Sequence, residues 1–200
     1  MASAEPIPVV LGIGGGIAAY KAAELARALV ADNCRVQTVM TEAAQEFITP
    51  LTLAALTSNK VITQMFAKPG SDGVLASAVE HIEVARSNRL LVVAPATADL
   101  LAKFAHGLAG DFLSTLYLAF EGDVVLCPAM NSAMWAHPAT VENVNTLAAR
   151  PRHHVIQPDE GELACGTKGP GRLPDPARIA AFVHRILHQR HDLDGETILV

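Results

Sequence analysis

Short apolar runs alternate with longer stretches of helical periodicity along this 200-residue chain. The short runs predict buried strands at Pro8–Ile13, Arg35–Met40, Arg89–Pro95, Asp123–Pro128 and His153–Pro158. Amphipathic spacing predicts helices between them, at Ile17–Asp32, in the segment up to about Ala55, and at His81–Ser87, Asp99–His106, Asp111–Phe120 and Pro138–Ala149. Alternation at this spacing is typical of parallel strands joined by right-handed crossovers and covered on both faces. The pattern therefore predicts an α/β fold with a doubly wound parallel sheet in three αβα layers.

Two features stand outside this alternation. The stretch from Asp159 to Pro176, DEGELACGTKGPGRLPDP, is rich in glycine and proline and has no periodicity, so we expect a functional loop or flap. A helix is predicted from Pro176 to about Gln189, and the last six residues, GETILV, read as a strand without its turn. We therefore expect residues 1–190 to form one domain, and residues 191–200 to be a linker and the first strand of a further domain.

Composition narrows the class of protein. Aromatic residues make up only 4% of the chain, so the core must consist mostly of Ala, Val and Leu, which suits helices packed on a parallel sheet. The net charge of −5 and the lack of Lys/Arg clusters argue against nucleic acid as a partner. No apolar stretch has the length of a membrane span, and the first residues do not form a signal peptide.

The spacing of the three cysteines bears on disulfides and metal sites. Cys34, Cys127 and Cys165 lie far apart in the sequence and outside any CxxC spacing. We therefore expect neither a disulfide framework nor a metal site. Cysteine usage of this kind favours the reducing cytoplasm.

The glycine-rich stretch from Gly12 to Gly16 follows the first predicted strand, at the edge of the sheet where doubly wound folds bind ligands. Its backbone N–H groups could contact a phosphate at the start of the following helix. As a dinucleotide fingerprint the stretch fails, because Ile17 stands where a third glycine is required and no acidic residue closes the second strand. The pattern favours a mononucleotide over NAD, with a tight turn that binds no ligand as the alternative.

Other positions carry possible chemistry, each with a structural alternative. Thr97 and Asp99 follow the strand that ends at Pro95, where either residue could cap a helix or contact a ligand. His81 lies on a predicted helix, where a lone histidine is more often structural than a base. Cys165 lies in the glycine-rich flap, where a thiol is able to donate a proton or attack a substrate. The remaining histidines, at positions 106, 137, 153, 154, 184, 188 and 191, are interpreted as solvated.

Six stretches together resemble the homo-oligomeric flavin-containing cysteine decarboxylases, and within that family the decarboxylase half of the bacterial bifunctional coenzyme A biosynthesis flavoproteins. In chain order they are GGIAAYKAAEL, MTEAAQEFITP, EHIEVAR, APATADL, PAMNSAMW and ACGTKGPGRLPDP. Each stretch alone is a weak signal, but six in register over essentially the whole chain are highly specific.

The resemblance implies the Rossmann-like (flavodoxin-like) form of the predicted fold. It also implies FMN bound at a subunit interface, with 4′-phosphopantothenoylcysteine as the small-molecule substrate. The oligomer implied is a trimer that assembles further into a dodecamer. A phosphopantothenate-cysteine ligase domain is implied after residue 190.

The resemblance further implies roles for individual residues. The cofactor-binding residues would be Gly15, Gly16, Ile17, Thr41, Thr97, Ala98, Asp99, Leu100 and Ala129. The substrate-binding residues would be Asn131, Met134, Ala164, Cys165 and Gly166, with Met134 and Trp135 walling the pocket against water. His81 would act as base or orienter, Asn131 would hold the carboxylate, and Cys165 would donate a proton. Gly14 stands where relatives usually carry Ser or Thr.

The implied reaction is redox-neutral overall. FMN takes a hydride equivalent from the cysteine moiety, giving a thioaldehyde that accepts the electrons released when CO₂ leaves. Reduced flavin then converts the resulting enethiol to a thiol. The alternatives are a non-catalytic flavin-binding module, a prenyl-transferring flavin enzyme and a peptidyl-cysteine decarboxylase. The joint presence of His81, Asn131 and Cys165 favours an enzyme over the binding module.

Overall fold

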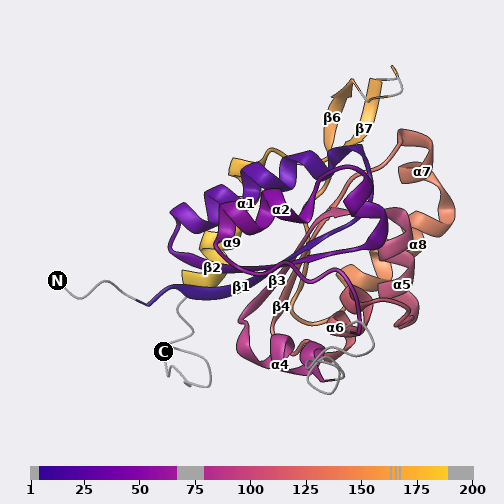
Figure 1. Cartoon of the computed structure of the whole chain (residues 1–200). Helices are drawn as coiled ribbons and strands as arrows, with labels where there is room; N and C mark the ends of the chain where they lie inside the picture. Colours follow the sequence, from indigo (N-terminus) through magenta and orange to yellow (C-terminus); the bar gives the residue numbers. More distant parts are fainter. Residues whose placement is uncertain (1–4, 67–78, 163, 165, 167, 189–200) are drawn as a thin grey trace, which may run out of the picture.

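The computed structural model describes residues 5–66, 79–162, 164, 166 and 168–188 (Figure 1). Five parallel strands form the central sheet in the order β2-β1-β3-β4-β5. They are β1 (Ile7–Ile13), β2 (Cys34–Met40), β3 (Leu90–Ala96), β4 (Asp123–Pro128) and β5 (His153–Val155). This order is that of a doubly wound, flavodoxin-like sheet, in which the direction of winding reverses between β1 and β3. The predicted α/β fold is confirmed.

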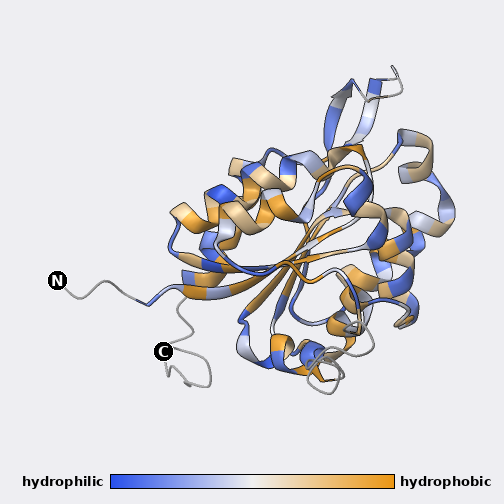
Figure 2. Ribbon diagram, in the orientation of Figure 1, coloured by the Kyte–Doolittle hydropathy of each residue, from blue (hydrophilic) through white to orange (hydrophobic). Residues whose placement is uncertain are grey.

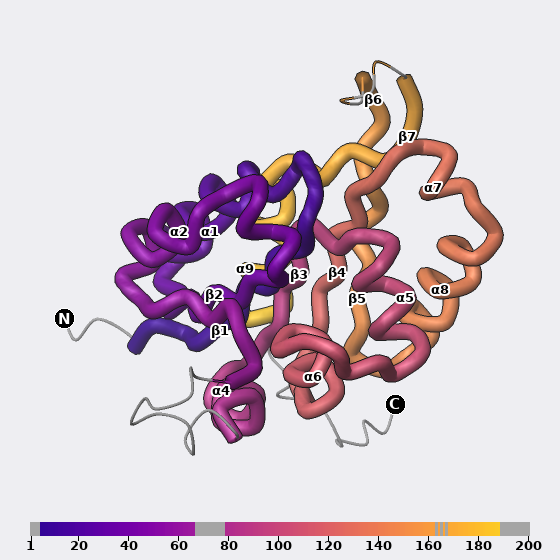
Figure 3. The backbone as a smooth tube through the Cα atoms, turned by 45° about the vertical axis from the view of Figure 1, so that its right-hand side comes forward, coloured from indigo at the N-terminus to yellow at the C-terminus, as the bar shows by residue number. Residues whose placement is uncertain are grey.

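Helices cover both faces of the sheet, and the tube in Figure 3 shows the two layers from a second side. One layer contains α1 (Lys21–Ala31), α2 (Pro50–Thr57) and α9 (Pro176–His188). The other layer contains α4 (Glu80–Ser87), α5 (Ala98–His106), α6 (Phe112–Ala119) and α8 (Pro138–Ala148). Three shorter helices lie at strand ends: η1 (Ile17–Tyr20), η2 (Glu42–Glu46) and α7 (Ser132–Ala136).

Neighbouring residues of each strand belong to opposite cores. In β1, Val9 packs in the core beneath α1 and α9, whereas Val10 packs in the core beneath α4, α5 and α6. This division arises because successive side chains of a strand point to opposite faces of the sheet. Both faces are covered, so every residue of β3 is buried. Figure 2 accordingly shows the strands among the most hydrophobic parts of the ribbon.

Three details differ from the predicted pattern. Strand β5 ends at Val155, earlier than the predicted end at Pro158. The stretch predicted as a loop contains an antiparallel hairpin of β6 (Asp159–Glu162) and β7 (Lys168–Arg172). The short helix α7 between β4 and α8 was not predicted. The hairpin gave no sequence signal because glycine, proline and charged residues fill DEGE and KGPGR, where alternating apolar residues would mark a strand.

The predicted strand GETILV and the predicted boundary at residue 190 lie outside the described residues. Within the described ranges, no helix combines the length and the apolar character that a membrane crossing requires.

Candidate active site

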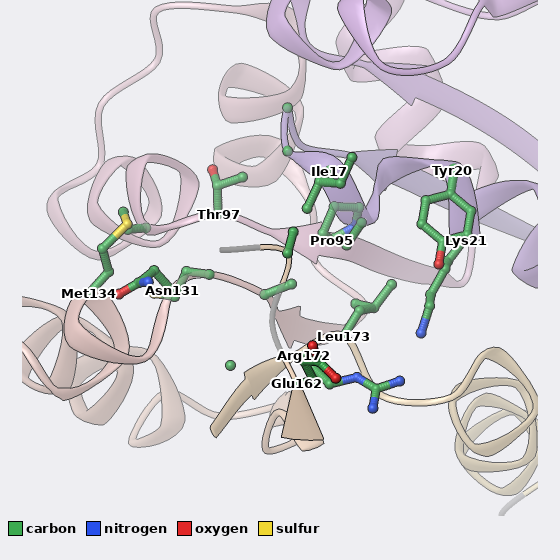
Figure 4. Close-up of a pocket in the computed structure, with 18 of the residues that line it drawn as sticks. Ile17, Tyr20, Lys21, Pro95, Thr97, Asn131, Met134, Glu162, Arg172 and Leu173 are labelled. Carbon is green, nitrogen blue, oxygen red and sulfur yellow. The ribbon is translucent and has the colours of Figure 1, made fainter. Parts of the chain in front are cut away.

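A cavity of about 860 Å³ lies beyond the carboxyl ends of β1, β3 and β4 (Figure 4). Its walls are the turn after β1, the turn after β3, the segment between β4 and α7, and the β6–β7 hairpin. The lining residues are Gly15, Gly16, Ile17, Ala18, Tyr20, Lys21, Pro95, Thr97, Ala98, Ala129, Met130, Asn131, Met134, Glu162, Ala164, Gly166, Gly171, Arg172 and Leu173. Because doubly wound sheets bind ligands at this edge, the cavity is the candidate active site.

The glycine turn after β1 forms the first wall. The Gly14 amide donates to the Pro95 carbonyl oxygen at 3.0 Å, which holds this turn against the end of β3. A Cβ atom at Gly14 would stand 2.6 Å from the same oxygen, so only glycine fits where the two backbones approach each other here. The next residues line the cavity at the start of η1, where the first N–H groups of a helix have no partner within the helix. These N–H groups are suited to an anion.

The turn after β3 forms the second wall. Thr97 lines the cavity and caps α5, with its hydroxyl oxygen accepting a hydrogen bond from the Leu100 amide at 3.3 Å. The interpretation of Thr97 as a helix cap is confirmed, and its contact with a ligand stays a prediction. Ala98 also lines the cavity. The Leu100 side chain is 1% exposed and lies in the core, and Asp99 forms an ion pair with Lys103 at 2.9 Å. Cofactor contacts by Asp99 and Leu100 stay predictions.

Thr41, at the end of β2, has a structural role. Its hydroxyl donates to the Ile13 carbonyl oxygen at 3.3 Å and accepts from the Ala44 amide at 3.2 Å, so it ties β2 to β1 and caps η2. Thr41 is not among the residues that line the cavity. Its proposed contact with a cofactor stays a prediction.

The segment after β4 forms the third wall. Asn131 lines the cavity and is the N-cap of α7, with Oδ1 accepting from the Ala133 amide at 2.8 Å. Ala129 and Met134 line the cavity as predicted, and Met134 is 48% exposed. Trp135, expected beside it, instead packs against the core beneath α5 and α8. The segment after β4 thus places the Asn131 amide and the Met134 thioether at the cavity. The Trp135 indole is not part of the lining and packs against the core.

The β6–β7 hairpin forms the last wall. Its base is joined to the third wall, because the Met130 amide donates to the Gly171 carbonyl oxygen at 2.9 Å. Gly171 has φ +137°, and a Cβ atom there would lie 2.2 Å from the Met130 carbonyl oxygen. Ala164 and Gly166 line the cavity at the predicted flap. Cys165 lies outside the described residues.

His81 lies at a different place in the molecule. It belongs to α4, which Figure 1 shows at the opposite end of the sheet from the β6–β7 hairpin, and it does not line the cavity. Its Nδ1 atom is buried and has no hydrogen-bond partner in the part of the chain that the structure describes. A single chain therefore brings Asn131 to the cavity without His81.

The two described cysteines are protonated and enclosed. Burial, with a smaller contribution from Asp32, raises the pKa of Cys34 to about 11. Burial also raises the pKa of Cys127, which is 0% exposed. A thiol with a raised pKa is a poor nucleophile, so neither residue is suited to a chemical role.

Sequence reasoning missed several residues of the cavity, among them Lys21, Glu162 and Arg172. It was also wrong about His153 and His154, which are partly buried and bonded. His153 Nε2 lies 2.8 Å from the Tyr117 hydroxyl, and His154 Nε2 lies 2.9 Å from an Asp123 oxygen. Among the described residues, no group of three or more His, Cys, Asp or Glu side chains could hold a metal ion.

Comparisons with known proteins show the family to which the chain belongs. Residues 2–188 match the family described as Flavoprotein. The coenzyme A biosynthesis bifunctional protein CoaBC of Vibrio cholerae is 47% identical over 196 residues, which are 96% of this chain and 46% of that protein. CoaBC of Mycobacterium tuberculosis is 40% identical over 199 residues, 98% of this chain and 46% of that protein. The chain therefore spans about half the length of the curated relatives it matches.

Two solved structures with a similar fold are of decarboxylases. A mutant PPC decarboxylase complexed with pantothenoylaminoethenethiol has a TM-score of 0.77 and 28% identity, covering 93% of this chain and all of that one. The FMN-dependent cysteine decarboxylase SpaF has a TM-score of 0.74 and 29% identity, covering 90% of this chain and 95% of that one.

Proposed function

The chain belongs to the Flavoprotein family, and we propose that it is an FMN-dependent phosphopantothenoylcysteine decarboxylase of coenzyme A biosynthesis. It converts 4′-phosphopantothenoylcysteine to 4′-phosphopantetheine with loss of CO₂. One observation carries the proposal: a single cavity is lined by the glycine turn, the Thr97–Ala98 turn, Asn131 and the flap residues on both sides of Cys165. The names of the relatives support the same activity.

The residues present fit FMN. Gly15 and Gly16 lead into η1, and the first N–H groups of a helix suit a phosphate. A Cβ atom at Gly15 would lie 2.4 Å from the Ala43 Cβ, so this turn has no room for a side chain on that side. Thr97 and Ala98 offer a second contact surface on the same cavity. We propose that these two turns, with Ile17 and Ala129, hold the flavin.

FMN held by these turns would supply the redox chemistry that makes loss of CO₂ from the substrate possible. Asn131 orients the carboxylate that leaves, a positioning effect in which an amide at a fixed strand end keeps the reacting group in one geometry. Met134 excludes water beside it. Cys165 donates the final proton to the product, a role that rests on the resemblance of its flap.

His81 requires a second subunit in this proposal. It acts as base or orienter but does not line the cavity of its own chain. We propose that the protein is a homo-oligomer, a trimer that assembles into a dodecamer, in which His81 of one subunit meets the cavity of another. Apolar side chains exposed at the cavity rim support such an interface, with Ile17 61% and Tyr20 53% exposed.

The remaining sequence predictions belong to the same proposal. Residues 1–190 are the decarboxylase domain, and the whole protein continues into a ligase domain. The 46% share of the relatives' length supports this division. The cytoplasm is the proposed location.

The test begins with the visible spectrum of the purified protein and continues with substrate under anaerobic conditions. We expect a flavin band and release of one CO₂ for each 4′-phosphopantetheine formed. Cys165→Ser should still release CO₂ but accumulate a product that lacks two hydrogens, detectable by mass. A colourless protein that FMN does not reconstitute, or a flavoprotein that releases no CO₂, would contradict the proposal, and the second result would favour a binding module.

A further inference from the structure

Resting on the proposed function, we infer that Lys21 and Arg172 form a phosphomonoester-binding site that holds the phosphate end of the substrate. Both residues line the cavity, one from the start of α1 and the other from the end of β7. Figure 4 shows both side chains extending to the same end of the cavity, with Asn131 and Met134 at the other end. The inference adds two cationic residues to the site and assigns them a ligand.

The charges of both residues are available to a ligand. Within the described part of the chain, neither Lys21 nor Arg172 has an ion pair or a hydrogen bond with another side chain. Some other cations among the described residues are instead bound by protein groups: Lys103 lies 3.1 Å from Asp111, and Arg150 donates to the Phe104 carbonyl oxygen at 2.9 Å. Lys21 is partly buried, and a partly buried charge is stabilised by an opposite charge. The cavity is where such an anion would bind.

The Arg172 side chain lies across the neighbouring strand of the hairpin. A Cβ atom at Gly161 would lie 2.5 Å from Arg172 Nη1 and 2.9 Å from its Cδ, so the arginine lies across the bare backbone of the neighbouring strand. Gly161 has φ +154°, a backbone conformation that disfavours side chains. The glycine therefore leaves the space that the Arg172 side chain occupies on its way to the cavity.

The separation of polar groups along the cavity matches a ligand with two different ends. Asn131, the proposed carboxylate partner, is at one end, and the two cations are at the other. The substrate has its carboxylate and thiol at one terminus and its phosphate at the other, joined by an uncharged chain. Arginine binds phosphate through two parallel N–H donors, and lysine adds a compact point charge. In a single orientation, the substrate can place its carboxylate at Asn131 and its phosphate at the two cations.

Glu162 modifies this site. Glu162 also lines the cavity, from the end of β6. Two cations and one carboxylate leave a net positive charge for the phosphate in a chain whose net charge is −5. The carboxylate weakens the attraction, so removal of its charge should strengthen phosphate binding. Substitutions at Glu162 and at Arg172 are therefore expected to act in opposite directions.

The flavin also carries a phosphomonoester, and the experiment distinguishes the two sources. It compares 4′-phosphopantothenoylcysteine with its dephosphorylated counterpart, pantothenoylcysteine, on the full FMN-loaded protein. Arg172→Ala and Lys21→Met should each lower kcat/KM for the phosphorylated substrate by about 10- to 100-fold, mainly through KM, as expected for a charge-assisted hydrogen bond. The dephosphorylated substrate should change less than about twofold, and the FMN dissociation constant should stay unchanged.

Three further variants serve as internal controls. Lys168 is a cation of the same strand, β7, but it does not line the cavity. Lys168→Ala should therefore leave kcat/KM unchanged for both substrates. Glu162→Gln should lower KM for the phosphorylated substrate only. Gly161→Ala keeps every charge but displaces the Arg172 side chain, so it should weaken phosphate recognition less than Arg172→Ala does.

Three results would overturn the inference: equal losses for both substrates, loss of FMN from Arg172→Ala or Lys21→Met, or a wild-type protein that does not prefer the phosphorylated substrate. A wild-type protein that decarboxylates neither substrate contradicts the proposed function instead. Calorimetric titration with 4′-phosphopantetheine and pantetheine then decides on the phosphate site. Tighter binding of the phosphorylated ligand, lost in Arg172→Ala, supports the site, and equal binding of the two ligands contradicts it.

Discussion

Asn131 and His81, the two described candidates for catalysis, lie in contrasting parts of the fold. Asn131 follows the carboxyl end of β4 and lines the cavity, where it caps α7 and neighbours a backbone hydrogen bond to the hairpin. His81 lies in the first turn of α4, outside the cavity, with its buried Nδ1 atom unpartnered in the described part of the chain. Asn131 is thus positioned at the cavity within one chain, whereas His81 of the same chain is not. The proposed enzyme would therefore need more than one chain to complete its site.

Substitution of His81 in α4 is expected to have the largest effect on the rate of CO₂ release. His81→Asn should lower the rate of CO₂ release by at least about 100-fold, since general acid–base groups contribute roughly 10²- to 10⁴-fold. FMN content should stay equal to wild type, because His81 does not line the cavity of its own chain. Stopped assays of CO₂ with the flavin spectrum as control measure both quantities. Normal CO₂ release would reduce His81 to a structural residue.

Mixed oligomers test whether His81 and Asn131 act from different subunits. His81→Asn and Asn131→Ala subunits, each inactive alone, should recover about a quarter of wild-type activity when unfolded, mixed equally and refolded, because a quarter of randomly paired interfaces join two intact residues. The measurement is the rate of CO₂ release per bound FMN. Mixing without refolding is the control. Recovery of no activity would show that both residues must come from the same chain.

Much of this arrangement could be predicted from the sequence. The run RLLVVAP predicts β3 because a strand covered on both faces needs continuous apolar residues, and Thr97 after it is a typical helix cap. The turns that follow β1, β3 and β4 meet at one edge for the same topological reason. Their contribution to one cavity therefore followed from the predicted order of strands and helices.

Other parts of the site had no local signal. In the β6–β7 hairpin, Gly171 fits against Met130 of a distant segment, and Gly161 fits against Arg172 of the facing strand. Lys21 and Arg172 are far apart in the sequence, and only the folded chain brings both to one cavity. Helical periodicity indicated that His81 lies on a helix, but it does not indicate which end of the sheet that helix covers.

The joint between the hairpin and the Asn131 segment can be tested separately. Gly171→Ala places a Cβ atom 2.2 Å from the Met130 carbonyl oxygen at φ +137°. We expect a loss of about 1–3 kcal/mol in the free energy of unfolding from backbone strain, with a fall in kcat. Denaturant unfolding and steady-state kinetics measure the two effects. Gly110→Ala is a matched control, because a Cβ atom at Gly110 would meet nothing within 4 Å; equal losses in both variants would contradict the account.

A network on the α4 side of the sheet should affect stability without affecting the cavity. Arg150 donates to the Tyr117 hydroxyl at 2.7 Å, and that hydroxyl lies 2.8 Å from His153 Nε2. Tyr117→Phe keeps the ring stacked on Phe104 but removes both hydrogen bonds of the hydroxyl and leaves His153 Nε2 without its partner, which should cost about 1–3 kcal/mol of unfolding free energy. FMN content should not change, and a variant that loses FMN in the folded state would show that the two regions are coupled.

The same network predicts a pH dependence. Burial is the main cause that lowers the pKa of His153 below its ordinary value of 6.5. The unfolded chain therefore binds the proton more readily, so the contribution of His153 to stability is complete above about pH 6.5 and is lost as pH falls toward the lowered pKa. Denaturant unfolding at pH 7.5 and 5.5 should show a larger loss for wild type than for His153→Gln. Equal losses would exclude His153 as the cause.

Substitution of Asp99 is expected to have the smallest effect on stability and FMN affinity. It tests whether the turn after β3 contacts FMN through this side chain or through its backbone. Its carboxylate pairs with Lys103 and is 69% exposed, and exposed ion pairs contribute about 0–1 kcal/mol. Asp99→Asn should therefore change stability by less than about 1 kcal/mol and FMN affinity by less than about twofold. Fluorescence titration of the apoprotein with FMN measures the affinity, with Thr97→Ala as the comparison, because Thr97 both lines the cavity and caps α5. A large loss of affinity in Asp99→Asn would mean that this carboxylate leaves Lys103 for the cofactor, and that the edge of the cavity rearranges when flavin binds.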